Sequence, residues 1–428
     1  MDETVEPVSN LDGSLTLPPD KSIAHRSAMF AALHEGESVI HNYSPAADPQ
    51  STLKCLEGLG VSIERDGYSV SVNGLSRDGF NTPEQDLDCG NSGTTMRLLS
   101  GIVGGAGVKA RLIGDESLSR RTMKRIIDPL KKMGIQIEAR EDNYAPLTIQ
   151  RNGPVKPMDF DLPIPSAQLK SCVLLAGLFG ENPTRVIETI PSRDHTERLL
   201  ELPVENVDGK RIISSSRAQA IPKQSYTIPG DFSAASFWLV AGSIFPNAKI
   251  LMQNVGINPT RTAAMHILQK MGATIELTRQ HQEGREPVTD LEVKGSELKP
   301  VNITPDQVPN CIDEIPILAV AMAFANGTSR IEGAGELRHK ETDRIMAVSK
   351  MLNAAGVSFT EYEDGLEITG RPDFIPEPAR YESFHDHRIA MSAGILSLKA
   401  DGESRISNAE CAAISYPMFW DHLKIMTN

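Results

Sequence analysis

Apolar and polar positions follow a helical period and then a strand period. This change recurs along the chain in one short sequence pattern, or phrase. A helical stretch ends on a glycine and passes directly into a β-branched strand. The glycine stands where a helix C-cap needs a left-handed residue, and the alternation after it is typical of a half-buried strand. The copies are LKCLEGLGVSIE (53–64), LKKMGIQIE (130–138), LQKMGATIE (268–276), a looser MLNAAGVSFT (351–360) and a degenerate RLLELPVEN (198–206).

The spacing of these copies predicts duplicated units. They recur about every 70–85 residues or at twice that interval, so about six units fit the chain, three in each of two domains. This density of strands and helices indicates an α/β fold with helices buried beneath sheets. A helix, a glycine and a strand also follow one another in unrelated α/β proteins, but repetition of the whole phrase favours duplication.

The chain is too long for one ordinary core, and two proline-containing segments suggest where it changes domain. TLPPDKS (16–22) and TIPGDFS (227–233) share a threonine, a proline and an aspartate before a helical run. Prolines stiffen such linkers. We therefore expect a discontinuous domain, 1–19 plus 229–428, and an inserted domain, 20–228.

Composition and charge exclude several classes of partner. The net charge of −13 disfavours nucleic acids and anionic membranes, although a small anion can still bind a local group of cations. The N-terminus is acidic, without the pattern of a signal or transit peptide, and no apolar run reaches the roughly 18–20 residues of a membrane span. Five scattered cysteines without a CxxC pair indicate a reducing cytoplasm and no zinc site.

Cations and hydroxyls gather at predicted helix starts, where free amides and the helix dipole bind anions. In DKSIAHRS (20–27), Asp20 is the expected N-cap and Lys21, Ser22 and Arg26 occupy the first turns. A solvated, charged first turn is the alternative. PSAQLKS (165–171) starts a very apolar helix with Ser166 and Gln168, which could equally be a capped core helix.

A Gly-rich loop, DCGNSGTTMRLL (88–99), leads into another helix. Gly90 and Gly93 would let backbone amides approach an anion, and Thr94 and Thr95 are the expected caps. A plain turn fits this segment as well.

Two segments of the expected discontinuous domain carry acidic groups. In NCIDEIPILA (310–319), Asp313 and Glu314 precede a buried-looking helix as either an N-cap or a base. In HKETDR (339–344), Lys340, Glu341 and Arg344 crowd one helix start, where the dipole disfavours cations, so a bound anion is the expected partner. A surface salt-bridge ladder is the alternative.

HDHRIAMS (385–392) adds His387 and Arg388 at a further helix start. His-x-His suggests a metal pair, but no additional ligand cluster accompanies it. The sequence therefore predicts no metal, and a metal-dependent phosphohydrolase is a minor alternative.

Taken together, these segments resemble the 5-enolpyruvylshikimate-3-phosphate synthase family over essentially the whole chain. The segments that carry the resemblance occur in the family's order: DKSIAHR, GNSGTTMR, GDESLSRRTM, SAQLKS, SRDHTE, PGDFSAASF, NPTRT, IDEIPILA, LRHKETDR and DHRIAMS. The resemblance implies a cytoplasmic monomer of two similar domains, each three βαβαββ repeats arranged as an inside-out α/β barrel. It also implies transfer of the enolpyruvyl group of phosphoenolpyruvate to the 5-hydroxyl of shikimate 3-phosphate, with release of phosphate and without a cofactor.

The resemblance also implies roles for individual residues. Asp313 is the expected base, and either Glu341 or Lys21 protonates the methylene carbon. The residues implied for shikimate 3-phosphate are Lys21, Ser22, Arg26, Ser166, Ala167, Gln168, Arg193, Asp313 and Lys340. Those implied for phosphoenolpyruvate are Lys21, Gly93, Arg121, Gln168, Arg344 and Arg388, with Asn91 and His387 in support.

The sequence departs from the family pattern at several positions. Pro19 replaces a glycine and should stiffen the crossing between domains. Thr122, Glu336 and Ile414 stand where many members have proline, asparagine and a substrate-binding lysine. Gly93 is retained where glyphosate-tolerant members have alanine, so we expect glyphosate sensitivity.

Two competing functions belong to other enzymes or classes. A sister enzyme transfers enolpyruvyl to UDP-N-acetylglucosamine, but it begins with Lys-Asn and uses a loop cysteine, whereas Cys89 precedes the Gly-rich loop. A non-catalytic anion-binding module is disfavoured because Lys21, Asp313 and Glu341 are all retained.

Overall fold

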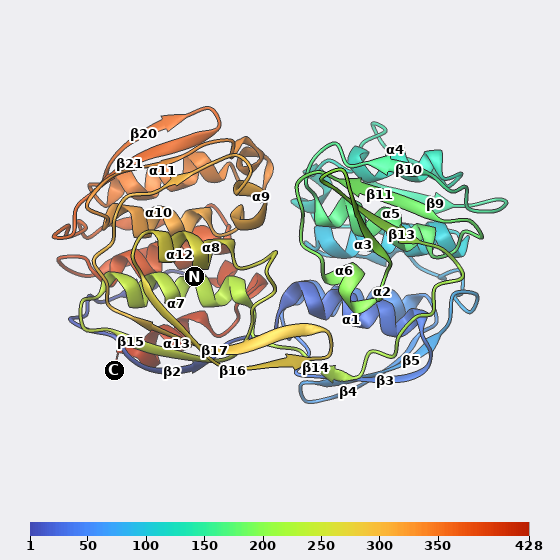
Figure 1. Ribbon diagram of the computed structural model, residues 1–428, viewed down its shortest axis with the longest axis horizontal. Coiled ribbons are helices and arrows are strands. Elements are labelled where there is room, and N and C mark those ends of the chain that lie inside the picture. Colours follow the sequence, from blue (N-terminus) through green and yellow to red (C-terminus); the bar gives the residue numbers. More distant parts are fainter. Residues whose placement is uncertain (428) are drawn as a thin grey trace. The chain divides into compact units, whose positions relative to one another are not determined.

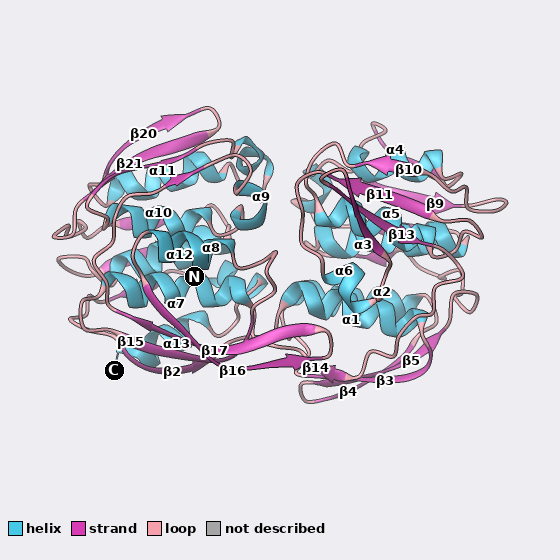
Figure 2. Cartoon of the chain, in the orientation of Figure 1, coloured by secondary structure: helices cyan, strands magenta, loops and turns pink. Residues whose placement is uncertain are grey.

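The computed structural model describes residues 1–427, and its chain divides into two compact units. Unit 1 comprises Met1–Pro18, Pro229–Gln282 and the chain from Pro287 onward, and unit 2 comprises Pro19–Ile228 with Glu283–Glu286. The chain thus changes unit inside the two proline-containing segments. In each unit the helices lie inside and the sheets lie outside them (Figures 1 and 2).

Unit 2 contains three four-stranded sheets, each with one parallel and two antiparallel pairings. The second and third copies run in the order βαβαββ, whereas the first takes its opening strand, β14, from the end of the unit. The strands are β3 (Glu35–His41), β4 (Ser62–Asp66), β5 (Ser69–Leu75), β6 (Leu87–Asp88), β7 (Ala110–Ile113), β8 (Gln136–Arg140), β9 (Tyr144–Gln150), β10 (Asp159–Asp161), β11 (Thr184–Glu188), β12 (Val204–Val207), β13 (Lys210–Ser215) and β14 (Tyr226–Thr227). The helices are α1 (Lys21–Leu33), α2 (Ala47–Gly58), α3 (Gly93–Ala106), η1 (Leu118–Arg120), α4 (Lys124–Lys132), α5 (Ala167–Gly177) and α6 (His195–Leu199).

Unit 1 repeats this plan with a shortened third copy, whose sheet has three strands and takes β1 from the N-terminus. The strands are β1 (Glu3–Val5), β2 (Asp12–Thr16), β15 (Lys249–Gly256), β16 (Thr274–Glu283), β17 (Glu286–Lys294), β18 (Asn302–Ile303), β19 (Gly327–Ile331), β20 (Ser358–Tyr362), β21 (Gly365–Gly370), β22 (Arg380–Glu382) and β23 (Ser404–Ser407). The helices are α7 (Phe232–Ile244), α8 (Ala263–Lys270), α9 (Val308–Cys311), α10 (Ile315–Ala323), η2 (Gly335–His339), α11 (Arg344–Ala354), α12 (His387–Ser397), η3 (Ala409–Ile414) and α13 (Phe419–Thr427).

The first helix of each copy forms the centre of its unit. Every residue of α7, α10 and α12 is buried, and α1, α3 and α5 are nearly as enclosed. Helices buried on all sides need apolar residues all round, which explains the uninterrupted hydrophobic runs that begin after each polar cap. Burying these helices beneath the sheets leaves their N-termini as the places where polar side chains meet.

The predicted helix–glycine–strand phrase is confirmed. Gly60, Gly134, Gly272 and Gly356 all have φ between +77° and +97°. The degenerate copy has Glu201 at this point, also left-handed with φ of +52°. The same turn therefore forms with and without glycine.

Candidate active site

In unit 2, the start of α1 positions Lys21 and Arg26. Asp20 is the N-cap, as predicted, and its carboxylate accepts a hydrogen bond from the Ile23 amide at 2.8 Å. Lys21 Nζ lies 3.0 Å from Asp48 Oδ2 and keeps a fifth of its side chain exposed. Asp48 thereby fixes the ammonium at the helix start without burying it.

Arg26 is buried and already bound to the protein. Its three guanidinium nitrogens donate to Thr196 Oγ1, the Ser22 carbonyl and Ser171 Oγ at 2.8–3.1 Å. Burial lowers the pKa of Arg26 to about 10, with Glu197 opposing this and Arg193 adding to it, so the side chain stays charged near neutral pH. These bonds use three of its five N–H groups, which leaves one on Nη1 and one on Nη2 for a ligand.

The Gly-rich loop caps α3 differently from the prediction. Ser92, and neither Thr94 nor Thr95, is the N-cap, and its hydroxyl accepts a hydrogen bond from the Thr95 amide. The helix begins at Gly93, two residues earlier than a Thr94 cap and three earlier than a Thr95 cap would start it. Gly90 has φ of +56°, a left-handed conformation that favours glycine, and a Cβ there would lie 3.0 Å from Ser51 Oγ.

Beside this loop, Arg121 and Arg97 are held by amide side chains. Arg121 Nη2 donates to Asn91 Oδ1 at 2.7 Å, and Arg97 Nη1 donates to Gln168 Oε1 at 2.7 Å. Gln168 in turn donates to Thr94 Oγ1 at 2.9 Å. The bonds of Gln168 join the first turns of α3 to the start of α5, and Asn91 ties Arg121 to the loop before α3.

The start of α5 adds hydroxyl and amide groups. Ser166 is its N-cap, and Ala167 and Gln168 are the first two helical residues. Arg193 is half-buried just before α6, close enough to Arg26 to lower its pKa. Unit 2 therefore brings together most of its predicted residues at helix N-termini.

In unit 1, Asp313 lies at the centre of the predicted residues. Its Oδ1 is 3.8 Å from Lys340 Nζ and 3.4 Å from Arg344 Nη1, and its carbonyl accepts a 2.8 Å hydrogen bond from Arg388 Nη1. Asp313 is not the N-cap of α10, because Glu314 holds that position. Burial lowers the pKa of Lys340, although the neighbouring Asp313 carboxylate opposes this.

The expectation that the charge of Arg344 needs a bound anion as its partner is wrong, because carboxylates of the protein already pair with it. Asp343 caps α11, and Arg344 is its first residue and is almost wholly buried. Its nitrogens donate to Asp386 at 2.7 Å, Glu341 at 2.6 Å and Asp313 at 3.4 Å. Burial opposes the charge, but these carboxylates outweigh burial and raise the pKa of Arg344.

Asp386, which the sequence analysis missed, organises the start of α12. It is the N-cap and accepts a hydrogen bond from the Arg388 amide at 2.9 Å, while it also binds Arg344. His387 is buried at the first helical position. The preference for aspartate at helix N-caps could have identified Asp386 from the sequence, because it precedes an apolar run. That preference does not identify Arg344 as its partner.

Asp48 and Arg97 were also missed as site residues. Arg97 lies in a quoted motif, yet nothing local indicates that it reaches Gln168, 71 residues away.

Two of the residues that depart from the family pattern have direct structural contacts. Ile414 packs against the core of unit 1, and the Thr122 carbonyl accepts a hydrogen bond from Arg97.

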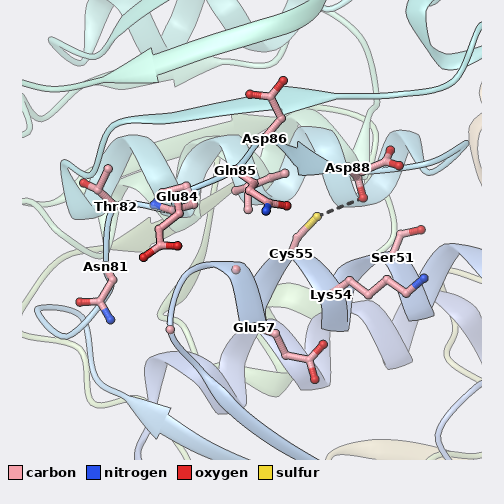
Figure 3. Close-up of a pocket in the computed structure, with 14 residues that line it drawn as sticks. Ser51, Lys54, Cys55, Glu57, Asn81, Thr82, Glu84, Gln85, Asp86 and Asp88 are labelled. Carbon is pink, nitrogen blue, oxygen red and sulfur yellow. Dashed lines mark hydrogen bonds between the residues drawn. The ribbon is translucent and has the colours of Figure 1, made fainter.

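A hollow in unit 2 lies beside α2 and segment 81–88 (Figure 3). Carboxylates from Glu57, Glu84, Asp86 and Asp88 line it beside Lys54. That charge is opposite to what a phosphorylated anion needs, and none of the predicted site residues is among those lining it.

Across residues 1–427, no cluster of His, Cys, Asp or Glu side chains is suited to a metal ion. No helix in the same range has the length and hydropathy to cross a membrane.

The arrangement of helices and sheets is found in other enzymes of known structure. An EPSP synthase from Acinetobacter baumannii superposes with a TM-score of 0.88 at 38% identity, covering 100% of this chain and 98% of that one. The enolpyruvyl transferase NikO from Streptomyces tendae shares the fold, with a TM-score of 0.77 at 16% identity. The fold is thus the two-domain inside-out α/β fold of enolpyruvyl transferases, as predicted.

Sequence comparison narrows this class. The family model described as "EPSP synthase (3-phosphoshikimate 1-carboxyvinyltransferase)" matches residues 5–423. The 3-phosphoshikimate 1-carboxyvinyltransferase of Salinibacter ruber is 47% identical over 99% of both chains, and that of Bacillus licheniformis is 42% identical over 97% of both. The chain belongs to the EPSP synthase family, and the predicted resemblance is confirmed.

Proposed function

We propose that this chain transfers the carboxyvinyl group of phosphoenolpyruvate to the 5-hydroxyl of shikimate 3-phosphate and releases phosphate, as an enzyme of aromatic amino acid biosynthesis. Family membership over nearly the whole chain is the observation that carries this function. The same relationships favour shikimate 3-phosphate over UDP-N-acetylglucosamine as the acceptor.

Asp313 is the proposed base for the attacking hydroxyl. It lies beside Lys340 and Arg344, which favour its ionised form, and part of its side chain stays exposed. Glu341 and Lys21 are the two proposed donors of the proton to the methylene carbon. Each carries a partner of opposite charge, Arg344 for Glu341 and Asp48 for Lys21, that orients it.

The proposed ligand groups form two sets. The residues proposed to bind shikimate 3-phosphate are Lys21, Ser22, Arg26, Ser166, Ala167, Gln168, Arg193, Asp313 and Lys340. The residues proposed to bind phosphoenolpyruvate are Lys21, Gly93, Arg121, Gln168, Arg344 and Arg388. Arginines suit these substrates because a guanidinium binds phosphate and carboxylate oxygens in pairs.

Release of phosphate from phosphoenolpyruvate, measured without added metal, tests the reaction. We expect turnover with shikimate 3-phosphate and none with UDP-N-acetylglucosamine, and the reverse result would contradict the proposal. Asp313→Asn keeps the shape of the side chain but cannot take up the proton. It should lower kcat by about 100-fold or more while changing KM little.

We also propose that the protein is a cytoplasmic monomer. Its five cysteines are buried free thiols, which suits a reducing compartment. Light scattering coupled to size-exclusion chromatography should give the mass of one chain, 46.6 kDa.

A further inference from the structure

Glu314 is a buried carboxylate to which the proposed reaction gives no role. It follows Asp313 at the start of α10 and has no exposed surface. Its Oε1 accepts a hydrogen bond from the Ser233 hydroxyl and lies 3.8 Å from Arg261 Nη1 and 3.7 Å from Arg388 Nη1. Within residues 1–427, its Oε2 is buried without a hydrogen-bond partner.

These distances show that Glu314 meets both arginines as a charge and not as a hydrogen-bond acceptor, because 3.7 Å exceeds hydrogen-bond length. A buried ion pair offsets its desolvation only when hydrogen bonds satisfy its remaining oxygens. Glu314 leaves one oxygen unsatisfied. Glu314 is therefore poorly arranged to stabilise the fold. Its role is better sought in the effect of its charge on the two neighbouring arginines.

Of the two arginines, Arg388 depends on Glu314 more. Arg261 Nη2 also lies 3.2 Å from the Asp231 carboxylate. In the described part of the chain, Glu314 is the carboxylate within ion-pair distance of Arg388. Removing its charge would leave Arg388 held by the Asp313 carbonyl alone.

Of the two arginines of unit 1 proposed to bind phosphoenolpyruvate, Arg388 has more N–H groups available for a ligand than Arg344. Its guanidinium donates one hydrogen bond within residues 1–427, from Nη1 to the Asp313 carbonyl at 2.8 Å, and a tenth of its side chain is exposed. The nitrogens of Arg344, by contrast, all donate to carboxylates. A group that fixes Arg388 from behind would leave its other N–H groups directed at an anion.

We propose that Glu314 is a positioning residue: its charge holds the Arg388 guanidinium in the orientation that binds phosphoenolpyruvate. Ser233 and Arg261 keep Glu314 in place from α7 and from the segment before α8. This inference rests on the proposed role of Arg388.

Glu314→Gln tests the inference, because it keeps the volume and an acceptor for Ser233 but removes the charge. We expect KM for phosphoenolpyruvate to rise about tenfold, the usual scale for losing a group that orients a ligand-binding residue, while kcat and KM for shikimate 3-phosphate change little. Glu314→Asp keeps the charge and should give an intermediate KM. Asp290→Asn is the matched control, since Asp290 is a buried carboxylate of β17 that pairs with Arg279. It should leave both KM values unchanged.

Arg388→Lys separates the two proposals. If Arg388 binds phosphoenolpyruvate, this change alone raises the KM for that substrate, and adding Glu314→Gln raises it no further. An unchanged KM in Arg388→Lys would reject the role of Arg388 and the inference with it. Two results would overturn only the role of Glu314, provided that Arg388→Lys raises the KM for phosphoenolpyruvate. One is an unchanged KM for phosphoenolpyruvate in Glu314→Gln. The other is a double variant in which the effects of the two changes on this KM multiply. If circular dichroism shows that Glu314→Gln does not fold, Glu314→Asp decides, and an unchanged KM in it overturns the inference.

Discussion

At the scale of residues, the arginines of the candidate site differ in what their nitrogens already bind. Arg26 donates to two hydroxyls and a carbonyl, and Arg344 donates to three carboxylates. Because most of their N–H groups already donate within the protein, each of these arginines fixes the helix start where it lies before any ligand arrives. Arg388 and Lys21, which keep exposed surface, are better placed to meet a substrate first.

Gly93 controls the position of Arg97. A Cβ at Gly93 would lie 2.9 Å from Arg97 Nη1 and 3.6 Å from Arg121 Nη1, so Arg97 must move away from Gln168. We expect Gly93→Ala to raise KM for phosphoenolpyruvate several-fold and to weaken inhibition by glyphosate, to which the unchanged enzyme should be sensitive. Steady-state inhibition assays measure both effects, and resistance of the unchanged enzyme would contradict the expectation.

His25 should make stability fall in acid. It is buried in α1 with Nδ1 2.6 Å from Thr52 Oγ1, and burial, helped by Lys21 and Arg26, lowers its pKa well below 6.5. The unfolded chain therefore takes up a proton at His25 below about pH 6.5 that the folded chain does not. Its contribution to stability is complete above that pH and is lost as the pH falls towards the folded pKa.

The loss approaches about 1.4 kcal/mol per pH unit for one proton. Urea unfolding between pH 7.5 and 5.5 measures it. His25→Gln should lessen the decline, whereas the matched change at the exposed His281 should not. Equal declines in all three proteins would exclude His25 as the cause.

At the scale of elements, a turn between the second helix and the following strand marks five of the six copies. The glycine there is left-handed, and its amide closes the helix while the chain enters the outer sheet, as at Gly134, whose amide bonds to the Lys131 carbonyl. Glu201 adopts the same conformation without glycine, so the burial of α6 and the pairing of β12 with β13 outweigh a local cost of about 1–2 kcal/mol.

Gly134→Ala isolates this cost. The added Cβ would meet nothing closer than 3.7 Å, so backbone strain at φ of +87° is the main effect. We expect about 1 kcal/mol of destabilisation in urea unfolding. Gly335→Ala is the control, because its nearest neighbour is 3.6 Å away and its φ is not left-handed. Equal effects of both changes would show that strain is not responsible.

At the scale of the whole molecule, the first 18 residues belong to a unit whose remaining chain follows the insertion. β2 pairs in parallel with β15, more than 200 residues later, and Leu11, Leu15 and Leu17 are buried in the core of unit 1. Full burial of each such side chain contributes about 1.5–3 kcal/mol.

A chain starting at residue 19 should therefore lose the fold of unit 1 and keep that of unit 2. Losing three buried leucines and the two strands β1 and β2 removes most of a domain's stability of about 5–15 kcal/mol. Hydrogen exchange read by mass spectrometry would show amide protection retained in α1, α3 and α5 and lost in α7, α10 and α12. Retained protection in α7 would contradict the expectation.

The sequence by itself determined the repeating phrase, the caps at Asp20 and Ser166, the family and the fold class. These features depend on neighbours within about four residues or on ordered motifs, which a linear chain displays directly. Only the tertiary structure decided which charges meet. Arg344 finds Asp313 and Asp386 31 and 42 residues away, and Glu314 faces Ser233 81 residues away. Such pairs form because buried helices bring distant N-termini together, and an ion pair inside a protein depends on that distance and not on separation along the chain.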